Sequence, residues 1–127
     1  MTYASSAARY QEMDVLTMSP ARRLVLLYGR LLLSLRQARA AITAGDIPTR
    51  AARLGKARDL LNELLFSLAR EAGGQLAARL AAWSVHMLSE LSAVDRKPDV
   101  ARLDRVLETV ATLHDAWAAA AQSQEPG

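Results

Sequence analysis

The sequence predicts an all-α protein that folds as an antiparallel, up-down four-helix bundle with a short mobile N-terminal cap segment. Apolar residues recur every three or four positions in four stretches of roughly 20–25 residues, long enough for each helix to span a small domain. The chain is 51% hydrophobic but only 5% aromatic, so Leu and Ala supply most of the packing, and helix formers outweigh β-branched runs. Four capping or breaking pairs separate the stretches: Ser19-Pro20, Gly45-Asp46, Gly73-Gly74 and Pro98-Asp99.

The first predicted helix begins at Pro20, because Ser19 is a favourable N-cap and proline suits the first helical position. Its apolar residues follow the heptad spacing that faces a core, and we call such a row the seam of a helix. Leu26 and Leu33 lie off this seam, so the helix is either central in the core or offers a second face to a partner. The seam consists of Leu24, Tyr28, Leu31, Leu35, Ala38 and Ile42.

The second predicted helix follows Gly45, which ends the first helix, and Asp46, which caps the next one. It ends at Gly73-Gly74, where glycine permits the positive φ of a tight reversal. Leu60 and Leu65 lie off its seam. The seam consists of Leu54, Ala57, Leu61, Leu64 and Leu68.

Two more helices complete the bundle, and the short connections predict that neighbouring helices run antiparallel. We expect residues 1–18 to form the cap segment, residues 19–117 the bundle, and residues 118–127, which lack large apolar groups, a frayed tail. The fourth helix begins near Pro98-Asp99. The third seam consists of Leu76, Leu80, Trp83, Met87 and Leu91, and the fourth of Val100, Leu103, Leu107, Val110, Leu113 and Trp117.

Composition and charge bound the setting in which the protein works. The chain has no cysteine, which excludes disulfides and thiolate metal sites. It also shows neither a secretory signal nor an apolar run of the ~18–20 residues that a bilayer span needs, so we expect a cytoplasmic protein. Residues 20–58 hold nine basic residues against one acidic residue, a local charge of +8. A solvated outer face explains this excess best, although such a face can also attract an acidic partner.

Residues that could carry chemistry are sparse. The two histidines, His86 and His114, lie on different predicted helices, and only Glu90 stands one turn from His86. The Glu-x-x-His pattern of di-iron bundles and the phosphate-binding loop are both missing from the sequence. We therefore expect no catalytic residues, no cofactor and no metal, and a protein that acts through its surface.

Landmarks spread from Tyr10 to Trp117 resemble a known family in their order and spacing. They are Tyr10-Gln11, Val15, Thr17, Ser19-Pro20, Leu27-Tyr28, Ala38, Ile42, Gly45-Asp46, Lys56-Ala57, Glu63-Leu64, Ser67-Leu68, Glu71, Gly73-Gly74, Leu80, Leu91, Asp99-Val100, Leu107, Leu113 and Trp117. The chain thereby resembles the flagellin-specific export chaperones, the FliS family. It departs from the family pattern at Gly29, where an acidic residue is common, and at Ser84 and His86, where tyrosines are common.

The resemblance implies a cytoplasmic chaperone. Such a protein binds the disordered C-terminal segment of flagellin, prevents its premature polymerisation and presents it to the flagellar type III export gate. The segment before the first helix, which contains Tyr10, would cover the binding surface and move when flagellin binds. We expect the cap to use Tyr10, Val15 and Leu16. We expect the off-seam leucines to line the grooves that receive flagellin, namely Leu26, Leu33, Leu60 and Leu65.

Two other functions stay open. A basic helical domain that binds nucleic acid or has a regulatory role would use the arginine-rich half, and its affinity for nucleic acid would fall steeply with salt. An unrelated adaptor or homodimeric bundle would use the surplus apolar surface on itself and would assemble as its concentration rises.

Overall fold

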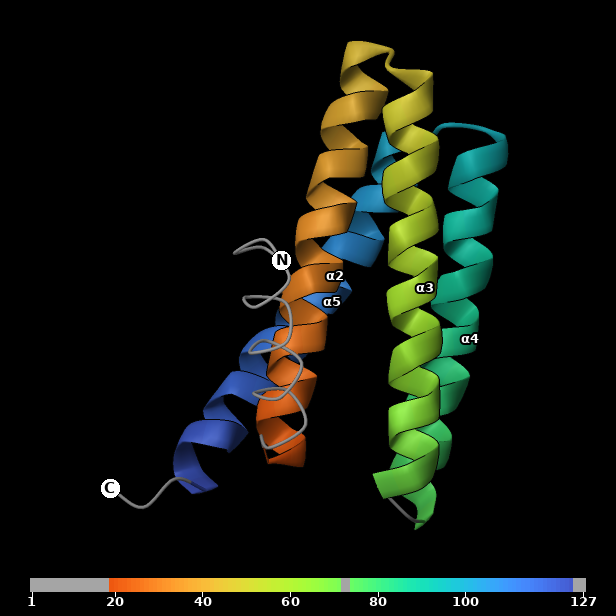
Figure 1. Cartoon of the computed structure of the whole chain (residues 1–127). Helices are drawn as coiled ribbons and strands as arrows, with labels where there is room; N and C mark the ends of the chain where they lie inside the picture. The colour runs from red at the N-terminus through yellow and green to blue at the C-terminus, as the bar shows by residue number, and fades with distance from the viewer. Residues whose placement is uncertain (1–18, 72–73, 125–127) are drawn as a thin grey trace, which may run out of the picture.

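The structure, a computed structural model, describes residues 19–71 and 74–124, and that part of the chain contains four long helices and no strand (Figure 1). The predicted all-α four-helix bundle is confirmed. The expected cap segment, residues 1–18, lies outside the described residues. The helices are α2 (Pro20–Ala44), α3 (Ile47–Glu71), α4 (Gly74–Arg96) and α5 (Val100–Gln124).

Local hydrogen bonds set the helix ends where the capping residues predict them. The Ser19 hydroxyl accepts a hydrogen bond from the Arg22 N–H at 3.3 Å, and Gly45 ends α2 in the left-handed region with φ of 70°. The Asp46 carboxylate accepts from the Thr49 N–H at 3.2 Å and from the Thr49 hydroxyl at 2.7 Å. The Asp99 carboxylate accepts from the N–H of Arg102 at 3.1 Å in the same way. The boundaries predicted at these caps are confirmed.

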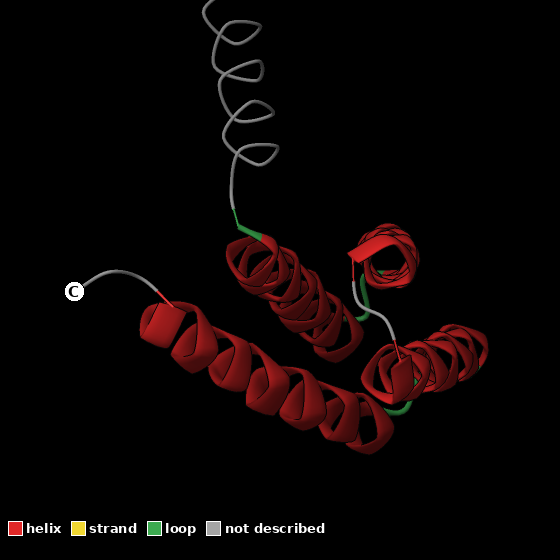
Figure 2. Cartoon of the chain, turned by 90° about the horizontal axis from the view of Figure 1, so that it is seen from below, coloured by secondary structure: helices red, strands yellow, loops and turns green. Residues whose placement is uncertain are grey.

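Helix α2 lies between two neighbours, α3 on one side and α5 on the other (Figure 2). Helix α4 packs against α3 and closes the bundle by meeting α5 over a shorter stretch. Charged contacts join three of the helix pairs. Arg39 Nε lies 2.6 Å from Asp104 between α2 and α5, and Asp95 of α4 contacts both Arg58 Nη1 at 3.4 Å and Arg50 Nε at 3.8 Å on α3. The contact of the third pair, α4 and α5, lies at one end of the groove described below.

The core agrees with the predicted seams at most positions. Tyr28, Leu31 and Leu35 of α2 are fully buried, as are seam residues of the other three helices. Two assignments are wrong. Leu60, placed off its seam, is only 2% exposed, because α3 has neighbours on both sides and buries an arc wider than one seam. Leu76, placed on its seam, is 58% exposed, because α5 has diverged from the first half of α4 and does not cover it.

The last helix runs further than expected. Helix α5 continues to Gln124, beyond the predicted boundary at Trp117. Alanine is the strongest helix former, so this alanine-rich stretch stays helical without large apolar groups, and Ala121 within it is buried. The side chain of Leu68 lies outside the described residues. No described helix combines the length and the apolar character that a membrane span requires.

Candidate binding groove

The α4–α5 pair differs from the other neighbouring pairs because the two helices diverge. Near the connection at Pro98 they lie side by side, but α5 then crosses towards the N-terminal end of α2 while α4 stays beside α3 (Figures 1 and 2). The first half of α4 and the second half of α5 therefore face each other across a gap in the bundle surface. A groove of about 440 Å³ lies between them.

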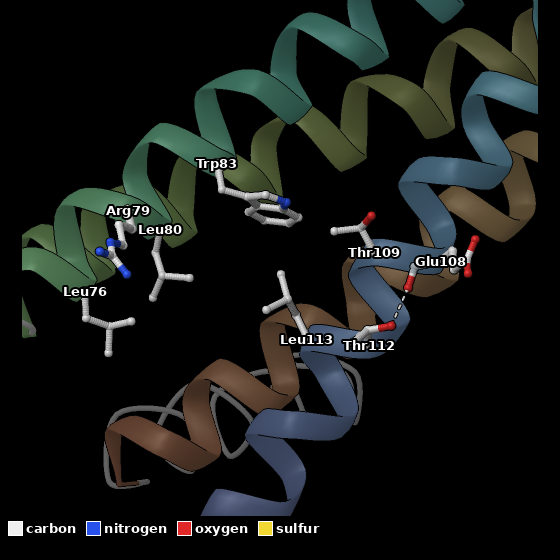
Figure 3. A pocket seen from close by; sticks show the side chains of 8 residues that line it. All are labelled: Leu76, Arg79, Leu80, Trp83, Glu108, Thr109, Thr112 and Leu113. Carbon is white, nitrogen blue, oxygen red and sulfur yellow. Dashed lines mark hydrogen bonds between the residues drawn. The ribbon is translucent and has the colours of Figure 1, made fainter.

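Apolar side chains from both helices line this groove. Leu80 and Trp83 from α4 and Leu113 from α5 converge on it, and Leu76 stands at its open end (Figure 3). Leu80 is buried and Trp83 and Leu113 are half-buried, so the lining grades from core to surface. The α5 wall also carries Thr109 and Thr112; the Thr112 hydroxyl donates to the Glu108 carbonyl of its own helix. The remaining lining residues are Arg79 and Glu108.

An aromatic cluster forms the rigid back of the groove. The Tyr28 ring, fully buried in the core, lies 6.1 Å from the Trp83 ring and 6.5 Å from the Trp117 ring, centroid to centroid. Both pairs are tilted, by 34° and 31° respectively, within the range of favourable aromatic contacts. Burial raises the pKa of the Tyr28 hydroxyl above its ordinary value. Tyr28 packs against one side of Trp83, whose indole is half-buried in the groove wall.

Towards the α4–α5 connection the groove becomes polar. Arg102 Nε of α5 forms an ion pair with the Glu90 carboxylate of α4 at 2.8 Å. His86 Nε2 lies 3.9 Å from the same carboxylate. His86 and Glu90 are one helical turn apart on α4, so this is the contact that their spacing in the sequence allows. Arg105 and Lys97 line the same end of the groove.

Nothing in the described part of the chain resembles a reactive centre. No three His, Cys, Asp or Glu side chains there come together in a way that could hold a metal ion. His114 contacts Asp115 at 3.2 Å on its own helix, away from His86 and its partner. The groove can therefore bind a ligand through apolar contact and charge, and it has no side chains arranged for bond-making chemistry.

The site residues predicted from sequence do not gather in this groove. Leu26 is half-buried and Leu33 is 55% exposed, two turns apart on the outer side of α2, so this pair does offer apolar surface. Leu65 is half-buried on α3, whereas Leu60 lies in the core and presents no surface. The other three predicted residues, Tyr10, Val15 and Leu16, lie outside the described residues.

Sequence reasoning missed the groove itself. The spacing in the sequence places three of the lining residues at ordinary seam positions: Leu76, Trp83 and Leu113. Their exposure comes from the divergence of α5, which a local sequence pattern does not reveal. One signal was present: Thr109 and Thr112 flank Leu113 where a fully packed helix face would carry larger apolar residues.

Comparisons with known proteins agree on one family. The sequence model of the family described as "Flagellar protein FliS" matches residues 3–124. A "Flagellar secretion chaperone FliS" from Vibrio cholerae serotype O1 is 32% identical over 99 residues, covering 78% of this chain and 73% of that protein. The protein of the same name from Bacillus subtilis strain 168 is 32% identical over 115 residues, covering 91% of this chain and 85% of that protein.

Proposed function

The chain belongs to the FliS family of flagellar proteins, and from that premise we propose that it is a cytosolic export chaperone for flagellin. It is a chaperone and not an enzyme. Its relatives are flagellar secretion chaperones, so its partner is a substrate of flagellar export. In this proposal the chaperone binds the C-terminal segment of flagellin, prevents premature polymerisation, and delivers the segment to the export gate.

The observation that carries the proposal is the apolar groove between α4 and α5. Exposed apolar grooves commonly mark interaction sites, and Leu76 stands 58% exposed at the mouth of this one. A segment that is disordered when free can fold into helices as it lays apolar side chains along such a surface. Coupled folding of this kind buries on the order of 1,000–3,000 Å², which is enough to mask the surfaces that flagellin uses to polymerise.

Apolar surface on α2 extends the area available to a long segment. Leu33 is exposed and Leu26 is half-buried on this helix, and neither residue lines the α4–α5 groove. A bound chain that folds around the bundle could contact both regions, because the 1,000–3,000 Å² of coupled folding exceeds what a single groove offers. In the free protein, we propose that Tyr10, Val15 and Leu16 cover part of this surface.

The first experiment is a calorimetric titration of the full chain with the C-terminal ~50–60 residues of the same organism's flagellin, a length suited to the area above. We expect one-to-one binding with a large negative heat-capacity change, because apolar area is buried. Between 50 and 200 mM salt the affinity should change less than about tenfold, whereas six to ten phosphate contacts would cost about 10³–10⁵. Absence of binding by folded protein would contradict the proposal, and a steep salt dependence would favour nucleic acid.

The role of the cap is tested by Tyr10→Ala, with Tyr3→Ala as the control that removes a second N-terminal tyrosine. We expect Tyr10→Ala to weaken flagellin binding at least about fivefold, as loss of an interface tyrosine commonly does, and to leave the unfolding temperature unchanged. Tyr3→Ala should alter neither quantity. A large loss of unfolding temperature with normal affinity would make Tyr10 a structural residue instead.

A further inference from the structure

The groove between α4 and α5 has two chemically distinct halves. Its open end is mainly apolar and is lined by Leu76, Leu80, Trp83 and Leu113, together with Arg79, Glu108 and two threonines. Its other end, towards the Pro98 connection, carries charged side chains from both helices. Helices α4 and α5 form the walls of both halves. Thr109 of α5 lines the apolar cavity and also the neighbouring polar one, so the two are adjacent. A helix lying along the groove would therefore meet both.

Contacts within the bundle engage some of these charged side chains and leave others without a partner. Glu90 is paired with Arg102, and the Asp99 carboxylate is used as the N-cap of α5. Among the described residues, the side chains of Arg79, Lys97 and Arg105 have no hydrogen bond or ion pair. Glu108 is the one carboxylate of the lining that is likewise unpaired there. The charge left for a ligand is therefore positive.

We propose that this groove selects a helix with an apolar anchor at one end and a carboxylate about two turns away. The inference rests on the proposed function, and the helix is a part of the bound flagellin segment. The anchor packs on Trp83 between Leu80 and Leu113, and the carboxylate pairs with Arg105. Leu113 and Arg105 are eight residues apart on α5, so the two contact points lie on the order of 12 Å apart along the groove.

This spacing determines the register in which a helix can bind along the groove. Along an α-helix, 12 Å corresponds to about seven or eight residues, so anchor and carboxylate fall on the same face of the ligand. Apolar contact supplies most of the affinity, and the ion pair at the rim sets which register is preferred. A segment with the same apolar residues but a basic residue at the second position would place like charges together and be rejected.

The apolar half is tested by Leu76→Ser against Val85→Ser. Both residues lie on α4 and both are 58% exposed, but Val85 does not line the groove. Because the two changes remove similar exposed apolar surface, neither should lower the unfolding temperature by more than a few degrees. In calorimetry with the flagellin C-terminal segment, we expect Leu76→Ser to weaken binding about tenfold. Val85→Ser should stay within about twofold of the parent protein.

The charged half is tested by Arg105→Glu against Arg53→Glu. Both arginines are exposed and have no partner among the described residues, and Arg53 lies on α3 away from the groove. We expect Arg105→Glu to weaken binding about five- to tenfold at low salt, with the difference shrinking at high salt. Arg53→Glu, which carries the same change of charge, should stay within about twofold. Replacing acidic residues of the segment by Lys one at a time should restore binding to the Arg105→Glu variant at a single position.

The outcomes separate this inference from the proposed function. If the parent protein binds the segment and both test variants weaken relative to their controls, the inference holds. If the parent binds but Leu76→Ser and Arg105→Glu bind as their controls do, flagellin occupies another surface, and the inference falls while the proposed function stands. If the parent itself does not bind the segment, both fall together.

Discussion

The seam of α2 and the seam of α4 have the same heptad spacing but different environments. In α2 the seam is buried from its first turn, with Leu24 at 7% exposure and Leu31 and Leu35 at zero. In α4 the second half is equally buried, with Leu91 at zero, but the first turn leaves Leu76 58% exposed. The difference lies in the neighbouring helices. Helix α2 has a helix on each side, whereas α5 does not lie beside the first half of α4. The same pattern thus makes a core where two helices flank it and an open groove where one of them diverges.

The largest expected effect comes from truncating equivalent positions of the two seams. Leu24→Ala removes a buried side chain and should destabilise the fold by about 2 kcal/mol or more, since loss of transfer energy is joined by a cavity. Leu76→Ala lies at the same place in its own helix but is already exposed, and should cost less than about 1 kcal/mol. Denaturant unfolding of both variants measures the two values. Equal losses of unfolding free energy would mean that Leu76 is packed as tightly as Leu24, and that the two seams do not differ.

A smaller, stabilising effect is expected from Gly29→Ala in the close contact between α2 and α5. A methyl group at Gly29 would lie 3.7 Å from His114 Nε2 and 3.9 Å from its Cδ2, which is ordinary van der Waals contact. Alanine is also the better helix former, so the variant should gain about 0.5–1 kcal/mol. Gly55→Ala on α3, where the nearest atom is the mobile end of Arg58 at 3.9 Å, is the matched control and should gain a similar amount. A loss of stability in Gly29→Ala alone would show that α2 and α5 are too close at this position to admit a methyl group.

The smallest effect concerns the cap between α2 and α3. Hydrogen bonds from the Thr49 side chain and backbone lower the pKa of the Asp46 carboxyl below its ordinary value of 3.8. The folded state therefore favours the charged form, and this contribution is complete above the unfolded-state pKa and is lost as pH falls through the folded-state pKa. Asp46→Asn keeps an N-cap acceptor but has no charge to titrate. Unfolding temperatures measured from pH 5 to about pH 2 should fall slightly less for this variant than for the parent protein. Parallel curves would show that the carboxylate contributes nothing to the cap.

The sequence predicted the parts of the fold that depend on local chemistry. Ser19, Gly45, Asp46 and Asp99 mark the helix ends because each satisfies backbone groups within a few residues of itself. Heptad spacing likewise predicted the fully buried residues of α2, since a seam must face something.

The groove could not be predicted in the same way. Spacing gives the direction in which a side chain points on its helix, but not whether a neighbouring helix is present there. Leu60 and Leu76 were misplaced for this reason: α3 is flanked on both sides, and the first turn of α4 is not. The divergence of α5 is a property of the whole bundle, so the site that depends on it appears only when the four helices are assembled.

Trp83 can report directly on whether flagellin occupies the groove, because its side chain lines it. The chain has two tryptophans, so Trp117→Phe leaves Trp83 as the only one. The variant is titrated with a tryptophan-free flagellin C-terminal segment, and emission is followed alongside calorimetry. If the α4–α5 groove binds the segment, the half-buried indole loses water and its emission shifts to shorter wavelength in step with the binding isotherm. Binding by calorimetry with unchanged Trp83 emission would contradict the account and place flagellin elsewhere on the bundle.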